Sequence, residues 1–332
     1  MTEVSWSRCG GADCIRLEGL GSTATVAVRP APAVAGDFPP TAGRLVRDGD
    51  DMCFVPRFAF VDGTLYAVAV DGATVAVLLR PSRHRLATTQ VIAIRPTASE
   101  VPRNLLRLYV WFSAPMSEGY TAGNIRLSDE AGREMTGALL PMDHELWDGS
   151  RHRLTVLLDP ARIKRGLTGH RQEGYPLRPG EPFRLMVSDG FRDAREICLR
   201  APAERRYEVG GEERQRVEPD NWILAVPPHH TFEPLDVVFE RPLDHGLLAR
   251  CLRVIGPDGR LVDGTQQVGS QERSWRLAPR TAWAPGAHQL FVDPVLEDLA
   301  GNSVSRVFDR DLTRSDDDPI PARPVMVTFQ PS

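Results

Sequence analysis

The chain has 332 residues, of which 42% are hydrophobic and 25% charged, so it can bury ordinary cores and is not intrinsically disordered. Its length fits two or three domains rather than a single sandwich. A net charge of −4 gives no overall attraction to nucleic acid or to an anionic membrane, and no long apolar run predicts a membrane span.

The N-terminal segment has no basic stretch followed by an apolar one, so no signal peptide is predicted and we expect a cytoplasmic protein. Export stays open if the N-terminus is truncated. The five cysteines, Cys9, Cys14, Cys53, Cys198 and Cys251, are scattered without a CxxC pair. Cys9 and Cys14 would suit a hairpin disulfide in an oxidising compartment, but without an export signal we expect free thiols.

Short runs rich in Val, Ile, Leu and aromatic residues, bounded by Pro, Gly and Asp, predict strands along the whole chain. In chain order these are residues 25–28, 65–70, 74–79, 91–94, 106–112, 154–158, 183–187, 235–239 and 289–292. The 28 Gly and 28 Pro supply frequent turns, as in β-sandwiches. Only residues 160–165 and 246–250 resemble single helical turns.

An internal repeat is the most informative feature of the sequence. Residues 108–137 align with 235–264 without a gap, and ten of the thirty positions are identical. The identities include the pair Phe112 and Phe239 and the pair Pro115 and Pro242. We therefore expect each pair to occupy equivalent positions in two similar modules.

A degenerate copy of the same pattern opens the chain, in GDDMCFVP followed by VDGTLYAVAV. The fold class predicted is therefore all-β, with three consecutive immunoglobulin-like β-sandwich modules. The expected boundaries give a degenerate module at 1–87, a module with a charged insertion at 88–202, and a third module at 203–332. The segment 325–329 is expected to form a C-terminal strand on an open sheet edge, for example that of an earlier module.

The segments FSAPM and FERPL, a Gly-Arg hairpin and the closing turn DLAGN at 298–302 resemble bacterial Ig-like domains of the surface-layer and adhesin type. The second copy departs from that pattern, because residues 193–196 contain neither Gly nor Asn. The segments VPRNLLRLYVWFSAPMS, ELWD, DPARIKRGL and PLDHGLLAR also resemble an uncharacterised family of multi-Ig-like bacterial proteins. This resemblance covers about two thirds of the chain and implies the fold, with binding or spacing rather than chemistry.

The second module contains an insertion, residues 161–178, that the third module covers in a few residues. The insertion and the loop before it gather charged residues beside an aromatic one, which could bind an anionic or sugar-like ligand. The ligand-binding residues predicted are His144, Glu145, Trp147, Asp148, Arg162, Lys164, Arg165, His170 and Arg171. The alternative is that the two loops pack together through salt bridges, with Trp147 covering the edge of the module.

No HExxH, HxH or Cys/His cluster is present, so no metal site and no cofactor are expected. Glu297, Asp298 and Asn302 could ligate calcium, but DLAGN more simply makes a turn. The catalytic and nucleotide-binding motifs GxSxG, SxxK, GxGxxG and GxxxxGK[ST] are also missing.

These observations favour a non-catalytic, multi-module Ig-like binding or scaffolding protein, whose partner is another protein or a small anionic or sugar-like ligand. The alternative is a cytoplasmic enzyme of unfamiliar type, for example in specialised metabolism, with its site on the insertion or between modules. The missing motifs favour the first hypothesis, and the missing signal peptide favours the second.

Overall fold

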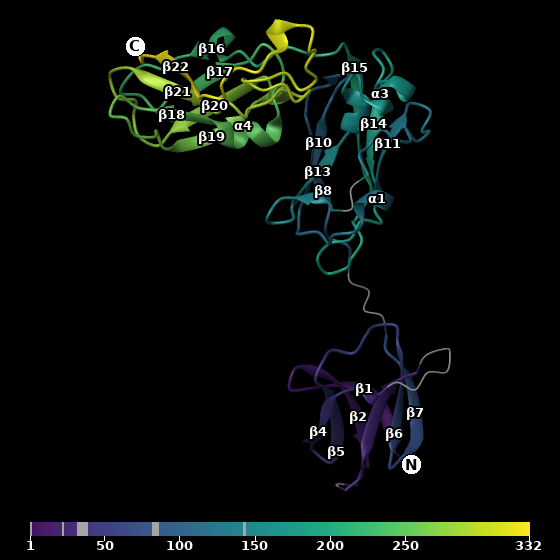
Figure 1. Ribbon diagram of the computed structural model, residues 1–332. Helices are drawn as coiled ribbons and strands as arrows, with labels where there is room; N and C mark the ends of the chain where they lie inside the picture. The colour runs from purple at the N-terminus through teal and green to yellow at the C-terminus, as the bar shows by residue number, and fades with distance from the viewer. Residues whose placement is uncertain (1, 22, 32–38, 82–85, 142–143) are drawn as a thin grey trace. The chain divides into compact units, whose positions relative to one another are not determined.

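The computed structural model describes residues 2–21, 23–31, 39–81, 86–141 and 144–332. Only about 9% of the chain is helical, and the contacts divide it into two compact units, residues 1–85 and residues 86–332 (Figure 1). The predicted fold class is confirmed: the chain is all-β and consists of consecutive immunoglobulin-like β-sandwich modules.

Module one, residues 1–85, is a sandwich of two antiparallel sheets. Its strands are β1 (Glu3–Cys9), β2 (Ala12–Glu18), β3 (Val26–Pro30), β4 (Gly43–Asp48), β5 (Asp51–Pro56), β6 (Leu65–Val70) and β7 (Ala73–Leu79). They form one sheet in the order β1-β2-β5-β4 and a second in the order β3-β6-β7. Ile15, Leu17 and Phe54 of the first sheet share a core with Tyr66 and Val68 of the second.

Within its described residues, module two has eight strands in two sheets. The strands are β8 (Val91–Arg95), β9 (Glu100–Pro102), β10 (Arg107–Phe112), β11 (Ile125–Asp129), β12 (Leu146–Trp147), β13 (Arg153–Leu157), β14 (Phe183–Val187) and β15 (Ala203–Gly210). The sheet orders are β12-β13-β10-β8 and β11-β14-β15-β9, in which only β9 and β15 pair in parallel. Three short helices, α1 (Thr121–Asn124), α2 (Pro160–Ile163) and α3 (Thr168–Glu173), lie in the connections.

Module three has seven strands. They are β16 (Ile223–Ala225), β17 (Leu235–Val238), β18 (Leu252–Ile255), β19 (Gly264–Val268), β20 (Ser274–Pro279), β21 (His288–Val292) and β22 (Val325–Phe329). The sheet orders are β16-β17-β20-β19 and β18-β21-β22. The module also contains α4 (His245–Cys251) and the 3-10 helices η1 (Pro219–Asn221), η2 (Ser270–Glu272) and η3 (Ser315–Asp317).

The strand order explains the sequence repeat. The order β12-β13-β10-β8 of module two recurs as β19-β20-β17-β16, and β11-β14-β15 recurs as β18-β21-β22. Phe112 and Phe239 are both buried, and their backbone N–H groups donate to the equivalent carbonyls of His152 and Arg273, each at 2.8 Å. The two copies therefore keep the same sheets, the same core aromatic position and the same backbone hydrogen bond from that aromatic residue to the neighbouring strand.

The closing turn is also kept, although its sequence changed. Asp193 and Asp298 each accept hydrogen bonds from the backbone N–H groups two and four residues further along. Glu196 takes the left-handed backbone conformation (φ 61°) that Gly301 takes in module three (φ 82°). The Asp298 carboxylate thus accepts hydrogen bonds within the DLAGN turn. This is the structural role that the sequence offered as the alternative to binding calcium.

The strand pairing around residue 203 and at the C-terminus defines where modules two and three begin and end. Strand β15, Ala203–Gly210, pairs with β14 and completes the second sheet of module two. We therefore place the second boundary after residue 210, and use module two for residues 86–210 and module three for residues 211–332. The C-terminal strand β22 pairs with β21 of its own module.

We expect Phe112→Ala and Phe239→Ala each to destabilise the chain by about 3–5 kcal/mol, because both remove a buried aromatic ring and leave a cavity. Phe112 packs on Phe191, with ring centroids 5.4 Å apart, and Phe239 packs on Trp222 at 4.7 Å. Urea unfolding measures the loss, and Phe232→Ala, at a 63% exposed position, is the control. Similar losses at Phe112 and Phe232 would contradict the assignment of a core position.

Candidate functional site

Glu145 and Trp147 fix the loop that precedes β13. The Glu145 carboxylate accepts hydrogen bonds from the backbone N–H of Thr121 at 2.6 Å and from the indole N–H of Trp147 at 2.7 Å. Burial would raise the pKa of Glu145, but these bonds outweigh it and hold the pKa below its usual value. The Trp147 ring packs on Phe112 and Phe191, so Trp147 covers one end of the module-two core.

Asp148 closes the turn that leads into β13. Its Oδ1 accepts the backbone N–H groups of His152 and Arg153 at 2.9 and 3.0 Å, and its Oδ2 accepts the Ser150 hydroxyl at 2.8 Å. Burial works against the charge, yet these bonds hold the pKa of Asp148 below its usual value. His144, the remaining predicted residue of this loop, is exposed.

The insertion folds into α2 and α3, and Arg162 ties the two helices together. Its guanidinium donates to the carbonyl oxygens of Gly137 at 3.1 Å and Gly174 at 3.2 Å. The Nδ1 atom of His170 lies 2.6 Å from the carbonyl oxygen of Arg162, and the His170 ring meets Tyr175 edge-on. Arg162 and His170 therefore hold the insertion in shape.

Lys164 and Arg165 join the insertion to module three. The ammonium of Lys164 lies 4.4 Å from the centre of the Phe308 ring. Arg165 bonds Asp309 twice, through its backbone N–H at 3.1 Å and its Nε at 3.0 Å, and its guanidinium lies 3.7 Å from Asp311. The charged insertion thus supplies contacts between two modules.

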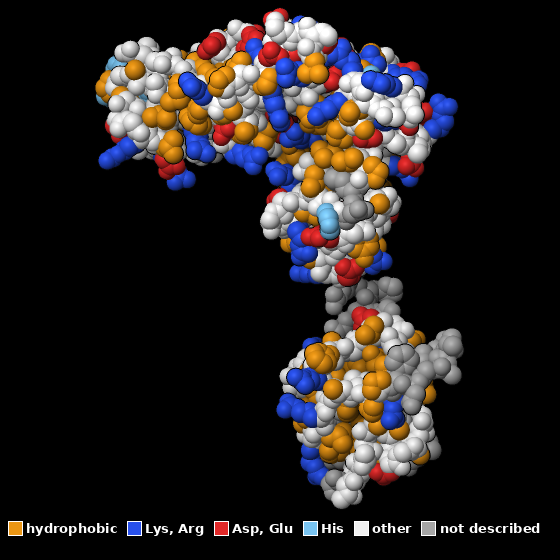
Figure 2. All heavy atoms as spheres, viewed as in Figure 1, with side chains coloured by type: hydrophobic (Ala, Val, Ile, Leu, Met, Phe, Trp, Pro, Cys, Tyr) orange, Lys and Arg blue, Asp and Glu red, His pale blue; other side chains and the backbone are white. Residues whose placement is uncertain are grey.

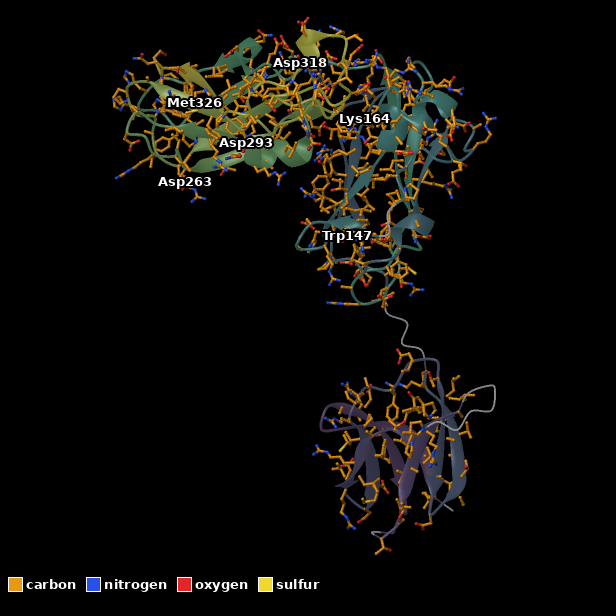
Figure 3. The ribbon with its side chains drawn as sticks, in the orientation of Figure 1. Trp147, Lys164, Asp263, Asp293, Asp318 and Met326 are labelled. Atoms are coloured by element: carbon orange, nitrogen blue, oxygen red, sulfur yellow. The ribbon has the colours of Figure 1, made fainter. Side chains whose placement is uncertain are left out.

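The two groups of predicted residues lie at opposite ends of module two. Figure 3 shows Trp147 toward the end that carries α1 and Lys164 toward the end beside module three. One loop enters β13 and the insertion leaves it, so a strand of about 17 Å separates them. The exposed Arg171 lies in α3, with the other insertion residues.

A groove of about 470 Å³ runs along the edge of module two and reaches the first group of residues. Its apolar lining comes from Ile125, Leu127, Met135, Leu139, Val156 and Leu157. Its polar lining comes from Glu118, Thr121, Arg126, Glu134, His144 and Glu145. We call this feature the edge groove.

The polar atoms of the edge groove suggest what it could hold. Three carboxylates, from Glu118, Glu134 and Glu145, line it against the single guanidinium of Arg126. The Thr121 side chain lies beside the Glu145 carboxylate and helps to hold the pKa of that carboxyl below its usual value. The lining is therefore net acidic, which suits a basic group on a bound molecule.

A second concentration of polar groups lies at the contact between modules two and three, which we call the junction. Glu272 of module three is fully buried and accepts hydrogen bonds from the backbone N–H groups of Thr97 at 2.7 Å and Ala98 at 3.1 Å. The Thr97 hydroxyl and His245 Nδ1 also bond this carboxylate. Burial would raise the pKa of Glu272, but its bonds from His245 and Thr97 hold the pKa below its usual value.

A buried cluster of charged groups lies beside Glu272. Asp244 begins α4 by accepting the backbone N–H of Leu247, and the same carboxylate accepts the Tyr109 hydroxyl at 2.7 Å. Arg107 pairs with Glu297 and lies 3.5 Å from Asp244. Burial raises the pKa of Tyr109, so it remains a hydrogen-bond donor.

Apolar packing continues across the junction. Leu299 and Phe308 belong to module three in sequence but pack with the core of module two. The backbone N–H of Leu106 donates to the carbonyl of Leu299 at 2.9 Å. A Cβ atom on Gly301 would lie 2.5 Å from the Leu106 side chain, so both the close approach and the positive φ require glycine here.

Sequence reasoning missed the junction residues. Glu272 and Thr97 carry no motif, and the resemblance of the segments that contain Tyr109 and Asp244 says nothing about their partners, which lie more than one hundred residues away. On the face shown in Figure 2, basic and acidic side chains are interspersed over residues 86–332. Among the described residues, no helix has the length and apolar run needed to cross a membrane.

No protein-family model and no curated protein matches the chain. Among solved structures, it resembles domains A168–A170 of titin, at 11% identity over 91% of this chain and 94% of that one, with a TM-score of 0.26. It also resembles a marsupial T cell receptor, at 8% identity over 99% and 98% with a TM-score of 0.26. A third likeness is to native alpha-2-macroglobulin from Escherichia coli, at 9% identity over 74% and 91% with a TM-score of 0.25.

Proposed function

We propose that this chain is a non-catalytic scaffold and binding protein, in which modules two and three act as one body that presents the edge groove. The observation that carries the proposal is that the buried charged groups at the junction form bonds with other groups of the protein. Glu272, Asp244, Arg107 and Arg165 all bond protein partners across the junction. Groups held in this way stabilise a fixed arrangement and have no free partner for substrate chemistry.

The sequence resemblance supports the same class of function. Ig-like domains of the surface-layer and adhesin type space or bind other molecules, and a locked pair of modules suits that use. Loops and openings on a rigid sandwich are common places for recognition. The edge groove fits this role, since the strands β11 and β13 that contribute to its lining are fixed by the core of module two.

The ligand that best fits the edge groove is a peptide segment with an apolar anchor next to a basic residue. The apolar lining would bury the anchor side chain, as in other concave sites. The carboxylates of Glu118, Glu134 and Glu145 would face the basic residue. Charge complementarity of this kind sets partner choice.

Selection of a displayed peptide library on the full chain tests this function. We expect enriched peptides to combine an apolar and a basic residue, and to bind about tenfold or more weakly to Ala122→Trp, which fills the groove from its exposed wall. The matched control is Ala131→Trp, on an exposed hairpin outside the groove. Peptides that bind both variants equally well, or no enrichment, would contradict the assignment of the groove.

A further inference from the structure

Three of the five cysteines meet on one face of module one, on the sheet β1-β2-β5-β4. Cys9 pairs with Ala12 and Cys14 pairs with Ser7 in the β1–β2 ladder, so Cys9 and Cys14 lie on the same face at diagonal positions. Cys53 of β5 pairs with Arg16 of β2, which places it on that face also.

This face is the one opposite the core of module one. Ile15 and Phe54, the neighbours of Cys14 and Cys53 in the chain, pack between the two sheets. Side chains alternate along a strand, so the cysteines point to the other side. Cys14 and Cys53 are nevertheless 0% exposed, and they are buried among the other side chains of that face.

Asp48 at the end of β4 completes the cluster. The ligand atoms of Cys9, Asp48 and Cys53 all lie within 4.8 Å of one another, and the side chain of Cys14, on the neighbouring strand β2, interacts with that of Cys53. Four ligands of a tetrahedral Zn²⁺ with bonds of about 2.3 Å lie about 3.8 Å apart. Side-chain movements of about 1 Å would bring the ligand atoms of Cys9, Asp48 and Cys53 to these distances, and Cys14 lies next to Cys53 as the fourth ligand.

The surroundings suit an anionic metal centre. Arg16 donates to Asp48 at 2.6 Å and to Asp51 at 3.2 Å, which orients the Asp48 carboxylate and leaves its second oxygen for a ligand bond. Three thiolates and one carboxylate around a divalent ion carry a net charge of −2, and the Arg16 guanidinium offsets part of it. Asp48 and Cys9 are only partly buried, so an ion can enter from solvent.

We infer that module one binds one soft divalent cation of the Zn²⁺ class, through Cys9, Cys14, Cys53 and Asp48. Each of the three thiols gives up its proton to solvent when its sulfur bonds the metal, so binding releases up to three protons and changes no oxidation state. This inference is independent of the edge groove, which lies in module two. Soft thiolate ligands select such a metal over Mg²⁺ or Ca²⁺.

Titration of the reduced full chain with Co²⁺, which takes the same tetrahedral sulfur sites, tests the inference. We expect saturation at one equivalent, a sulfur-to-cobalt charge-transfer band, and displacement of the band by Zn²⁺. The primary variant is Cys9→Ser, because Cys9 is half-buried and its replacement spares the fold. We expect it to lose the band or weaken binding more than about tenfold, with a smaller loss in Asp48→Asn.

Cys198→Ser and Cys251→Ser are the matched controls, since both cysteines lie outside module one, and they should leave the band unchanged. Circular dichroism of each variant checks that the fold is kept. The inference is overturned if the wild-type chain shows no charge-transfer band, or if Cys9→Ser and wild type bind Co²⁺ equally. A Cys9–Cys14 disulfide in the chain purified without reductant, with no metal taken up after reduction, also overturns it.

Discussion

Glu272→Ala should destabilise residues 86–332 by about 3–5 kcal/mol and loosen the contact between modules two and three. The replacement leaves the backbone N–H groups of Thr97 and Ala98 buried without an acceptor, together with the Thr97 hydroxyl. Urea unfolding of the full chain measures the loss. Hydrogen exchange should rise at residues 97–109 and 241–248, which meet at the junction.

The repeat supplies a matched control for this variant. Arg151 occupies in module two the place that Glu272 occupies in module three: the N–H of Met116 donates to the Arg151 carbonyl, and that of Leu243 donates to the Glu272 carbonyl. Both residues have a left-handed backbone, with φ of 56° and 52°. The strain of placing alanine there is therefore the same in both variants. Arg151 is exposed, so Arg151→Ala should cost little, and equal losses in the two variants would contradict a role for the Glu272 carboxylate.

The same contact predicts a dependence on pH. Hydrogen bonds hold the pKa of Glu272 below its usual value in the folded chain, whereas an unfolded glutamate titrates near about 4.3. The unfolded state therefore binds a proton first, and the stabilisation is complete above that value and lost as the pH falls through the folded pKa. Glu272→Gln should remove this part of the acid sensitivity, and an unchanged pH profile in that variant would count against it.

The repeat and the strand pattern were enough to predict the fold. Alternating apolar residues identify strands whatever their partners are, and a repeat aligned without a gap requires two copies of one module. Even the turn at Asp193 is kept, because Glu196 adopts the backbone that Gly301 adopts. The aspartate that begins the turn is present in both copies of the sequence. The positive φ of Glu196 could not be predicted, because a glutamate does not indicate that backbone conformation.

The junction could not be predicted in the same way. Leu299 and Phe308 read as ordinary apolar residues of module three, and only the docked structure shows them packing with the core of module two. Contacts of this kind depend on which surfaces of two folded modules meet, and local periodicity says nothing about that. A partial signal exists in the acidic residues that follow Leu299, because they need partners when they are buried.

The predicted ligand site illustrates a limit of reasoning from charge. His144 and Arg162 are close in sequence, but β13 lies between their loops and separates them by its own length. That separation could have been deduced once 154–158 was predicted to be a strand. The cysteines show the opposite case, since Cys9, Cys14 and Cys53 come together only through strand register, which the sequence did not fix.

Arg162→Glu combined with Arg165→Glu should destabilise the chain by about 3–5 kcal/mol or more. A glutamate at 162 would face the carbonyl oxygens of Gly137 and Gly174, and one at 165 would face the buried Asp309. Like charges and acceptors brought together out of water repel strongly, and Asp309 would lose one of its cationic partners.

Arg171→Glu is the matched control for this double variant, because it reverses an exposed charge in the same insertion and should change the free energy of unfolding little. Binding of groove-selected peptides should survive in the double variant wherever the chain remains folded, since the edge groove is lined by residues between 118 and 145 and by Val156 and Leu157, and by no described residue of the α2–α3 segment. Unchanged stability with loss of ligand binding would instead make the insertion a recognition surface. Arg165 and Asp309 lie 144 residues apart, whereas the partners of Arg162 lie within module two, so the stability loss of Arg165→Glu alone measures how far the charged insertion holds module three in place.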